Sequence, residues 1–362
     1  MKKISKRLIT IAAFLLGALL LACLAVTVTL AFFNSAPPFS FDAASDKDGV
    51  TVEAEDETQQ TAVLFEVRRG ESAQSVGLRL ADSGLIRSSF FWYLLCRFDK
   101  EHIKTGTYRI EVPTSQIAIH RMLISGKQIL FKVTIPEGLT IKKTARLLEE
   151  AGICAAEEFV AAASDPETLD RYRIPGTTME GYLYPDTYLF PPEFPAARVV
   201  RTMADTFFAK IAGIGEDVVA IPPDELNRLV TLASIVEREY RMAEEAPVMA
   251  GVFSNRLGIG MALQSCATVE YVITEIQGRP HPEILTTRDT EIRDPYNTYI
   301  LPGLPPGPIA SPGTVALRAV MNPSKTSYMY FRLVDADSGK HYFSNTLDDH
   351  IRAGALYVKG GY

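Results

Sequence analysis

The chain has 362 residues, of which 47% are apolar and 22% charged, a composition typical of a globular protein with a sizeable core. Its formal net charge of −6 and the lack of a long basic run after residue 7 argue against a general nucleic-acid binder, because phosphate affinity requires clustered lysine and arginine. The histidines and cysteines lack metal-ligand spacing, so the sequence predicts no metal site, no cofactor and no disulfide framework. The cysteines are Cys23, Cys96, Cys154 and Cys266.

The N-terminus has the pattern of a membrane anchor. Residues 1–7 are basic, and an uncharged stretch follows over residues 8–33. A helix needs about 20 apolar residues to cross the hydrocarbon core of a bilayer, and a basic flank stays in the cytoplasm. We therefore expect a single-pass anchor with all residues after Phe33 outside the cytoplasm. The alternatives are a cleaved signal peptide, which needs a shorter apolar region, and lipoprotein processing at Cys23, after which apolar residues still continue.

The next segment, residues 34–60, is rich in Ala, Ser, Pro, Asp, Glu and Thr and lacks periodic apolar positions. This composition predicts a flexible acidic linker rather than a folded unit. The folded part is then expected to begin near Thr61.

An internal repeat occupies the first half of the folded part. Residues 69–91 align without gaps with residues 137–159, and Gly84 of the first copy matches Gly152 of the second. Each copy follows a short β-type run and has the pattern of a turn, an amphipathic helix, a glycine stop and a second helix. Both glycines stand where a left-handed helix C-cap is expected.

A plausible returning strand after Gly106 completes a β-α-α-β unit over residues 61–130. Such a unit resembles the LysM peptidoglycan-binding module. The second copy lies in residues 131–163, at the start of a larger region that runs to residue 362. A duplicated structural unit without a ligand site is the alternative, because small β-α-α-β units are common.

The sequence from Asp224 to Ala246 predicts an amphipathic helix. Pro223 suits a helix entrance, and Asp224 suits the N-cap or the first turn. Apolar residues recur at helical spacing and mark a buried stripe. The stripe consists of Leu226, Leu229, Val230, Ala233, Val236 and Tyr240.

Glu237 falls on this apolar stripe, one helical turn after Ala233, whereas Glu239 is rotated by about 200° and is expected to face solvent. A buried carboxylate is costly unless it is paired, hydrogen-bonded or protonated. Burial also raises its pKa, which makes a glutamate a usable general acid near neutral pH. The alternative is a structural Glu237 that pairs with Arg238 or Arg241.

Two polar segments follow, at residues 251–272 and 294–313. The second contains a run of prolines and glycines that forms neither a helix nor a central strand, and such a rigid loop holds side chains at little entropic cost. Amide, hydroxyl and aromatic groups beside one acid are suited to sugar recognition. The expected substrate-binding residues are Asn255, Gln264, Ser265, Asn297 and Tyr299.

No second catalytic carboxylate is obvious in these segments. Ordinary glycosidases need two acids, whereas a lytic transglycosylase uses a nucleophile that its own substrate supplies. A hydrolytic muramidase would need a second acid, such as Glu239, Glu244 or Glu270. A non-catalytic peptidoglycan-binding protein that tethers the wall to the membrane is the alternative from another class.

The ordered motifs LASIVERE, VFSNRLGIGMALQS, YNTY and GLPPGPIASPG, with the tail over residues 328–350, closely resemble the YceG-like family of endolytic murein transglycosylases, also called MltG. The resemblance begins at about Leu64. It implies an α+β protein with an N-terminal transmembrane helix, a LysM-like module and a larger catalytic domain over residues 131–362. It also implies that Glu237, in the motif ASIVE, is the catalytic residue.

The resemblance further implies an enzyme of the bacterial inner membrane with an extracytoplasmic catalytic domain. The family cleaves the β-1,4 bond between N-acetylmuramic acid and N-acetylglucosamine in nascent strands, leaves 1,6-anhydro ends and terminates strand elongation. Its partners would be peptidoglycan strands and, as candidates, peptidoglycan synthases. The chain departs from the family at Cys266 and Ala267, where members often have Asp and Pro; we expect function to survive, with Cys266 as an oxidisable thiol.

Overall fold

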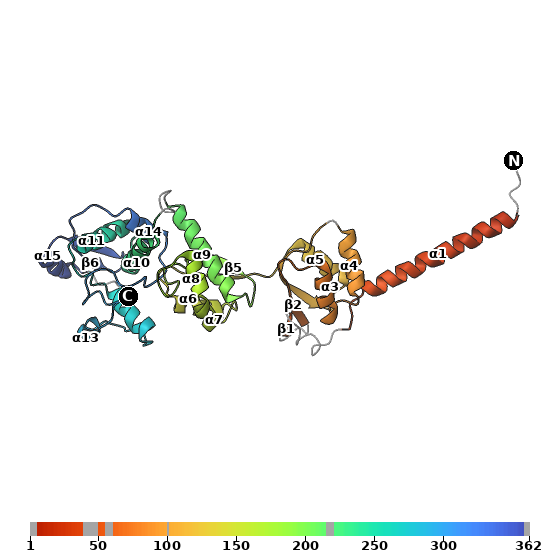
Figure 1. Cartoon of the computed structure of the whole chain (residues 1–362), viewed down its shortest axis with the longest axis horizontal. Coiled ribbons are helices and arrows are strands. Elements are labelled where there is room, and N and C mark those ends of the chain that lie inside the picture. Colours follow the sequence, from red (N-terminus) through yellow and green to blue (C-terminus); the bar gives the residue numbers. More distant parts are fainter. Residues whose placement is uncertain (1–5, 39–49, 55–60, 100, 215–220, 358–362) are drawn as a thin grey trace. The chain divides into compact units, whose positions relative to one another are not determined.

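The computed structural model describes most of the chain (Figure 1). The described residues are 6–38, 50–54, 61–99, 101–214 and 221–357. They form a mixed α+β protein with two compact units. The N-terminal unit is Met1–Leu130 and the C-terminal unit is Phe131–Tyr362. Each unit contains its own apolar core.

The first helix, α1 (Lys6–Asn34), is long and contains no acidic residue. Its segment Ile11–Asn34 is long and apolar enough to cross a membrane, which is consistent with a single-pass anchor. The end of α1 contacts the rest of the N-terminal unit, because Asn34 Oδ1 accepts a 2.9 Å hydrogen bond from the amide of Ile117.

The N-terminal unit is built on a three-stranded antiparallel sheet of order β1-β2-β3. Two helices, α3 and α4, lie between β2 and β3 in the chain, so the expected β-α-α-β order is present, with a further helix, α5, after it. The bounds are β1 (Val50–Ala54), β2 (Thr61–Val67), α3 (Ala73–Asp82), α4 (Ser89–Phe98), β3 (Gly106–Val112) and α5 (Gln116–Ser125). A LysM-like role for this unit stays a prediction.

The prediction of a linker throughout residues 34–60 is wrong over β1. This strand pairs with β2, with Val50 opposite Phe65, and Val50 is buried in the core of the unit. Its backbone therefore has hydrogen-bond partners that a free tether lacks. The acidic composition of the surrounding segment hides the short β pattern VTVEA.

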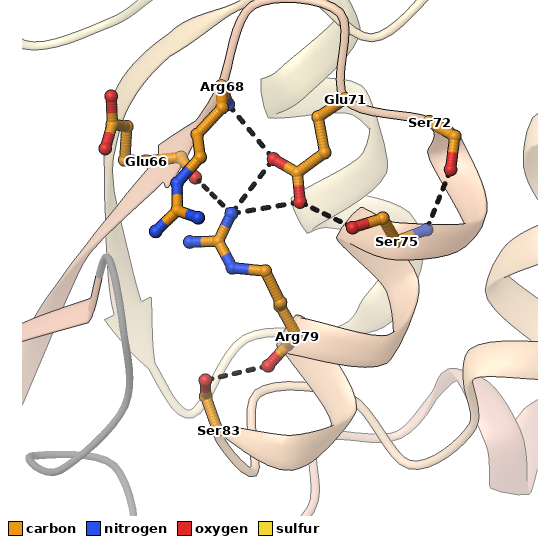
Figure 2. Close-up of polar contacts among 7 residues, drawn as sticks. All are labelled: Glu66, Arg68, Glu71, Ser72, Ser75, Arg79 and Ser83. Atoms are coloured by element: carbon orange, nitrogen blue, oxygen red, sulfur yellow. Dashed lines mark hydrogen bonds and ion pairs between the residues drawn. The ribbon is translucent and has the colours of Figure 1, made fainter.

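The turn from β2 into α3 is held by the carboxylate of Glu71 (Figure 2). This carboxylate accepts hydrogen bonds from the amide of Arg68 at 3.0 Å, the hydroxyl of Ser75 at 2.9 Å and the guanidinium of Arg79 at 2.9 Å. The Arg79 guanidinium also lies over the ring of Phe65, 4.7 Å from its centroid. Burial by itself raises the pKa of Glu71, but the three hydrogen bonds outweigh it and lower the pKa below its ordinary value.

The C-terminal unit contains two two-stranded antiparallel sheets, β4-β5 and β6-β7. The strands are β4 (Phe131–Thr134), β5 (Thr187–Phe190), β6 (Tyr330–Asp335) and β7 (Lys340–Ser344). The first helices are α6 (Ile141–Glu150), α7 (Ala156–Ala162), α8 (Pro166–Tyr172) and α9 (Ala196–Ala212). The later ones are α10 (Pro223–Glu239), α11 (Ala246–Gly258), α12 (Cys266–Tyr271), α13 (Thr287–Thr290), α14 (Thr314–Met321) and α15 (Leu347–Arg352).

The two copies of the repeat have the same local geometry. The helices α3 and α6 each begin at a hydroxyl N-cap, Ser72 and Thr140, whose oxygen accepts a hydrogen bond from a first-turn amide. After each helix comes a glycine with φ +68°, Gly84 in the first copy and Gly152 in the second. This left-handed backbone favours glycine and ends each helix at an equivalent place.

Helix α10 packs against α11 and α14 (Figure 1). It begins at Pro223, as expected, but ends at Glu239 rather than continuing to Ala246. The backbone of Tyr240 is extended, with φ −74° and ψ 148°, and a 3-10 turn over Ala243–Glu245 leads into α11. The predicted long helix is therefore two helices that meet at a bend.

Candidate active site

Glu237 lies in the last turn of α10, half-buried beside the fully buried Ala233 and Val236. Its Oε2 accepts a 2.8 Å hydrogen bond from the amide of Gly313, and its Oε1 accepts a 3.1 Å hydrogen bond from the hydroxyl of Tyr240. Burial raises the pKa of Glu237 to about 7, against the opposing effect of these hydrogen bonds. The carboxyl is therefore poised to give and take a proton near neutral pH.

Gly313 is brought to Glu237 by backbone pairing between two loops. The amide of Gly138 donates to the carbonyl of Ser311 at 2.9 Å, and the amide of Ser311 donates to the carbonyl of Leu139 at 2.8 Å. Gly313 itself is the N-cap of α14. The positive end of this helix therefore faces the carboxylate of Glu237 and stabilises its charged form.

A second carboxylate, Glu137, lies at this junction. A Cβ atom added to Gly313 would stand only 1.9 Å from Oε1 of Glu137, so the carboxylate rests on the face of this glycine. The negative charge of Glu137 adds to burial in raising the pKa of Glu237. The sequence pattern did not mark Glu137 as a site residue, because it lies in the turn of the second repeat copy. The only sequence feature that distinguishes it is its charge, since the first copy has Arg69 at the equivalent position.

Arg238 does not form an ion pair with Glu237, which was the alternative to a catalytic role for this glutamate. Its guanidinium instead donates to Glu270 at 2.9 Å and to the carbonyl of Gly138 at 3.3 Å. Arg238 thus ties α10 to α12 and to the turn that carries Glu137. The carboxyl of Glu237 is left to the Gly313 amide and the Tyr240 hydroxyl.

Glu239 does not face solvent as expected. It is half-buried, and its Oε1 accepts a 2.5 Å hydrogen bond from the hydroxyl of Ser265, which is itself buried. Burial raises the pKa of Glu239. The expectation was wrong because the segment before α12 covers the outer face of the last turn of α10, a contact that helical periodicity does not report. Ser265 supports Glu239, and we assign it this structural role in place of the predicted substrate contact.

A cavity of about 510 Å³ opens beside the end of α10. Its lining includes Arg238 and Glu239 of this helix together with two of the expected substrate-binding residues, Gln264 and Tyr299. We call this space the α10 cavity. Glu237 is not part of the lining, so the acid lies next to the cavity rather than inside it.

Gln264 and Tyr299 are held at the wall of the α10 cavity by the backbone. Gln264 has a left-handed backbone with φ +51°, and its amide donates to the carbonyl of Thr298 at 3.0 Å. A non-glycine residue in this region stores strain of about 1–3 kcal/mol, which is typical of functional sites. The hydroxyl of Tyr299 lies 3.1 Å from Sγ of Cys266, whose pKa is raised by partial burial, so little of this thiol is reactive thiolate.

Asn297 is fully buried and organises the second polar loop. Its Nδ2 donates to the carbonyls of Thr290 and Ile292 at 3.0 and 2.8 Å, and its Oδ1 accepts from the amide of Tyr299 at 2.9 Å. A side chain without exposure and with both ends bonded to backbone does not reach a strand in this conformation. Asn297 therefore positions the backbone of Tyr299, and this conformation does not support the predicted direct contact of Asn297 with the substrate.

Asn255 also has a structural role. Its Nδ2 donates to the carbonyls of Thr326 and Tyr328, both at 2.9 Å, which fixes the segment before β6 onto α11. Both hydrogens of the amide are used, and Asn255 does not line the α10 cavity. The sequence placed Asn255 and Gln264 in one motif, but the structure gives them different tasks.

Glu180 is a further buried carboxyl that no sequence pattern had marked. Both its oxygens accept 3.2 Å hydrogen bonds from the amide of Ile141, the first residue of α6. Burial raises the pKa of Glu180 to about 8, so it is mostly protonated at neutral pH. It fixes the start of α6, just after the turn that carries Glu137.

Residues 65–355 match the model of the YceG-like family, and the chain belongs to that family. It is 28% identical to an endolytic murein transglycosylase of Streptococcus pneumoniae, over 84% of this chain and 60% of that protein. It is 26% identical to an endolytic murein transglycosylase of Bacillus subtilis, over 85% of this chain and 88% of that protein. The resemblance drawn from the motifs is thereby confirmed.

A crystal structure of a yceG-like protein from Listeria monocytogenes has a similar fold, with a TM-score of 0.55 and 28% sequence identity. The similarity covers 81% of this chain and 99% of that one. The chain spans about 60% of the length of the pneumococcal relatives that it matches.

Proposed function

We propose that the protein is a membrane-anchored endolytic murein transglycosylase with Glu237 as its single acid and base. It cleaves the β-1,4 bond between N-acetylmuramic acid and N-acetylglucosamine of peptidoglycan strands and leaves 1,6-anhydro ends. The observation that carries this proposal is the environment of Glu237: a half-buried carboxyl with a pKa of about 7 and two hydrogen-bond donors. Family membership and the names of the relatives support it.

In the proposed reaction, protonated Glu237 donates its proton to the glycosidic oxygen as the bond to the muramyl C1 breaks. The muramyl C6 hydroxyl attacks C1 of its own ring and passes its proton to the carboxylate of Glu237. The acid returns to its starting state and no water is consumed. Proton transfer by a positioned group contributes about 10²–10⁴-fold, and the intramolecular nucleophile avoids the entropic cost of a second reactant.

The surroundings of Glu237 suit both steps. The Gly313 amide and the Tyr240 hydroxyl donate to the carboxylate that forms after the first proton transfer. Burial and the charge of Glu137 favour the protonated form that begins the reaction. In the α10 cavity, Gln264 and Tyr299 would bind the glycan.

The apolar α1 and its basic flank support an anchor in the bacterial inner membrane, with the C-terminal unit outside the cytoplasm. We further propose that residues 61–130 form a LysM-like module that binds glycan and that residues 131–362 form the catalytic domain. Cleavage within nascent strands would terminate their elongation, which makes peptidoglycan synthases candidate partners.

The test is to incubate the detergent-solubilised full chain with intact peptidoglycan and to identify the new chain ends by mass spectrometry. We expect anhydromuramyl ends from the wild type and none from Glu237→Gln, with Glu225→Gln on the exposed face of α10 as the matched control. Reducing ends would indicate a hydrolytic muramidase instead. Glycan binding without new ends would indicate the non-catalytic tether.

A further inference from the structure

The α10 cavity has a strongly cationic lining. Four arginines contribute to it against a single carboxylate, that of Glu239. Two of them are already engaged: Arg238 pairs with Glu270, and Arg256 donates to the carbonyls of Met329 and Leu263, both at 2.6 Å. The two arginines without such partners are Arg241 and Arg332.

Arg241 and Arg332 reach the same cavity because the β6-β7 hairpin packs on the bend after α10. A Cβ atom at Gly339, in the hairpin turn, would stand 2.7 Å from Cβ of Arg241, so the two segments are in close contact there. Arg332 lies on β6 of this hairpin. Both arginines are exposed, and among the described residues neither guanidinium makes a hydrogen bond or ion pair.

His350 adds a hydrogen-bonding group without a partner. It lines the α10 cavity from α15, and its ring lies 5.5 Å from the ring of Tyr330. Its Nδ1 is buried and has no hydrogen-bond partner in the described part of the chain. Buried polar groups in proteins are nearly always satisfied, so this nitrogen needs a partner that the described part of the chain does not supply.

We propose that Arg241, Arg332 and His350 form a subsite for a carboxylate of the stem peptide that hangs from N-acetylmuramic acid. The proposal rests on the proposed function, since it specifies which form of the glycan substrate the enzyme favours. N-acetylglucosamine is uncharged, and in a peptide-bearing strand the lactyl carboxyl of the muramyl unit is consumed in an amide bond. The negative charge of such a strand is therefore on its peptides, where an arginine pair binds it best.

The placement fits a substrate cut at Glu237. The subsite shares the α10 cavity with Gln264 and Tyr299, and Arg238, the neighbour of the acid, lines the same cavity. A muramyl unit whose C1 is beside Glu237 carries its peptide on C3 of the same ring. One side of the cavity would then hold sugar and the other side peptide.

The experiment compares kcat/KM of the full chain on two substrates: peptide-bearing strands, and strands from which an amidase has removed the peptides. We expect Arg241→Gln with Arg332→Gln to lose about ten-fold on peptide-bearing strands, the size of one charge-assisted contact. On stripped strands the variant should match the wild type. Arg228→Gln, an exposed arginine on α10 outside the cavity, is the control.

A loss of equal size on both substrates would overturn the proposal, because stripped strands offer only the lactyl carboxylate. An unchanged kcat/KM on peptide-bearing strands would overturn it too. Unfolding is checked by comparing the Tm of the variant with that of the wild type.

A binding measurement separates this proposal from the proposed function. Calorimetry with the free acidic stem tripeptide, and with the same tripeptide amidated at its carboxyls, probes the subsite whether or not the chain cleaves glycan. Binding of the acidic form alone, lost in the double variant, is the expected result. Equal binding of both forms would refute a stem-peptide subsite. Binding of inorganic pyrophosphate without any binding of the tripeptide would refute it too, because the arginines would then form a general anion site.

Discussion

The amide of Gly313 donates a 2.8 Å hydrogen bond to Oε2 of Glu237, so the N-terminus of α14 contacts the carboxyl group at the end of α10. The same glycine lies against the carboxylate of Glu137. One residue without a side chain thus lets two carboxylates approach each other. Several properties of the proposed enzyme follow from this contact.

Activity should fall as the pH rises through about 7, the pKa to which burial raises Glu237. The first step needs the protonated acid, and deprotonation removes it. The measurement is kcat/KM for anhydromuramyl end formation across the neutral range. A rate that stays constant well above this pKa would contradict the role of Glu237 as general acid.

Glu237→Gln should be more stable than the wild type at alkaline pH. The folded state raises the pKa of Glu237 from 4.5 to about 7, so it binds the proton more tightly than the unfolded state does. The stability that the protonated carboxyl contributes is therefore lost as the pH rises between these two values. The permanently neutral glutamine avoids this loss, so the free energy of unfolding of the variant should exceed that of the wild type by an amount on the order of 1–2 kcal/mol at alkaline pH. Chemical denaturation at pH values below and above this window checks it, with equal stabilities expected at the acid end.

Glu137→Gln should lower the pKa of Glu237, because it removes a negative charge that favours the protonated acid. The alkaline limb of the pH–rate profile should move to lower pH, while the rate at acidic pH changes less. Glu157→Gln, an exposed residue on α7, is the matched control. A profile that keeps its midpoint would show that Glu137 does not act on the acid.

Gly313→Ala should impair catalysis by steric displacement. The new Cβ would stand 1.9 Å from Oε1 of Glu137, so the carboxylate or the loop must move. Misplacement of about 1 Å at a reacting centre can cost about 100-fold in rate, and we expect a loss of at least about ten-fold. Gly258→Ala on α11 is the control because its Cβ would meet no atom within 4 Å. Equal activity of both variants would argue against the close fit.

Glu71→Gln should destabilise the N-terminal unit by about 1–2 kcal/mol, because the hydrogen bonds from Arg68, Ser75 and Arg79 lose their charged acceptor. The lowered pKa of Glu71 means that its contribution is present above the unfolded pKa and is lost as the pH falls through the folded one. The variant and wild type should therefore converge in acid.

The chain has a single tryptophan, the buried Trp92 in this unit, whose fluorescence reports the unfolding of the Glu71→Gln variant. Glu101→Gln, at an exposed position, is the control. A midpoint of unfolding equal to that of the wild type at neutral pH would contradict the assigned role of Glu71.

The sequence by itself was sufficient for the features that depend on local periodicity and spacing. The apolar stripe of α10 placed Glu237 toward the core, and the glycine spacing revealed the repeat in which Gly84 and Gly152 adopt the same φ. The ordered motifs identified the family. These features can be read from the linear sequence because helix geometry and turn chemistry depend on residues only a few positions apart.

Only the tertiary structure decided which distant groups meet. Glu137 and Gly313 reach Glu237 through the pairing of two loops, and Ser265 covers Glu239, which periodicity alone assigned to solvent. Asn297 carries the right chemistry for sugar binding, but its buried amide is consumed by the backbone. The physical reason is the same in each case: burial and hydrogen-bond satisfaction belong to the packed chain, and neighbours that are far apart in sequence supply them.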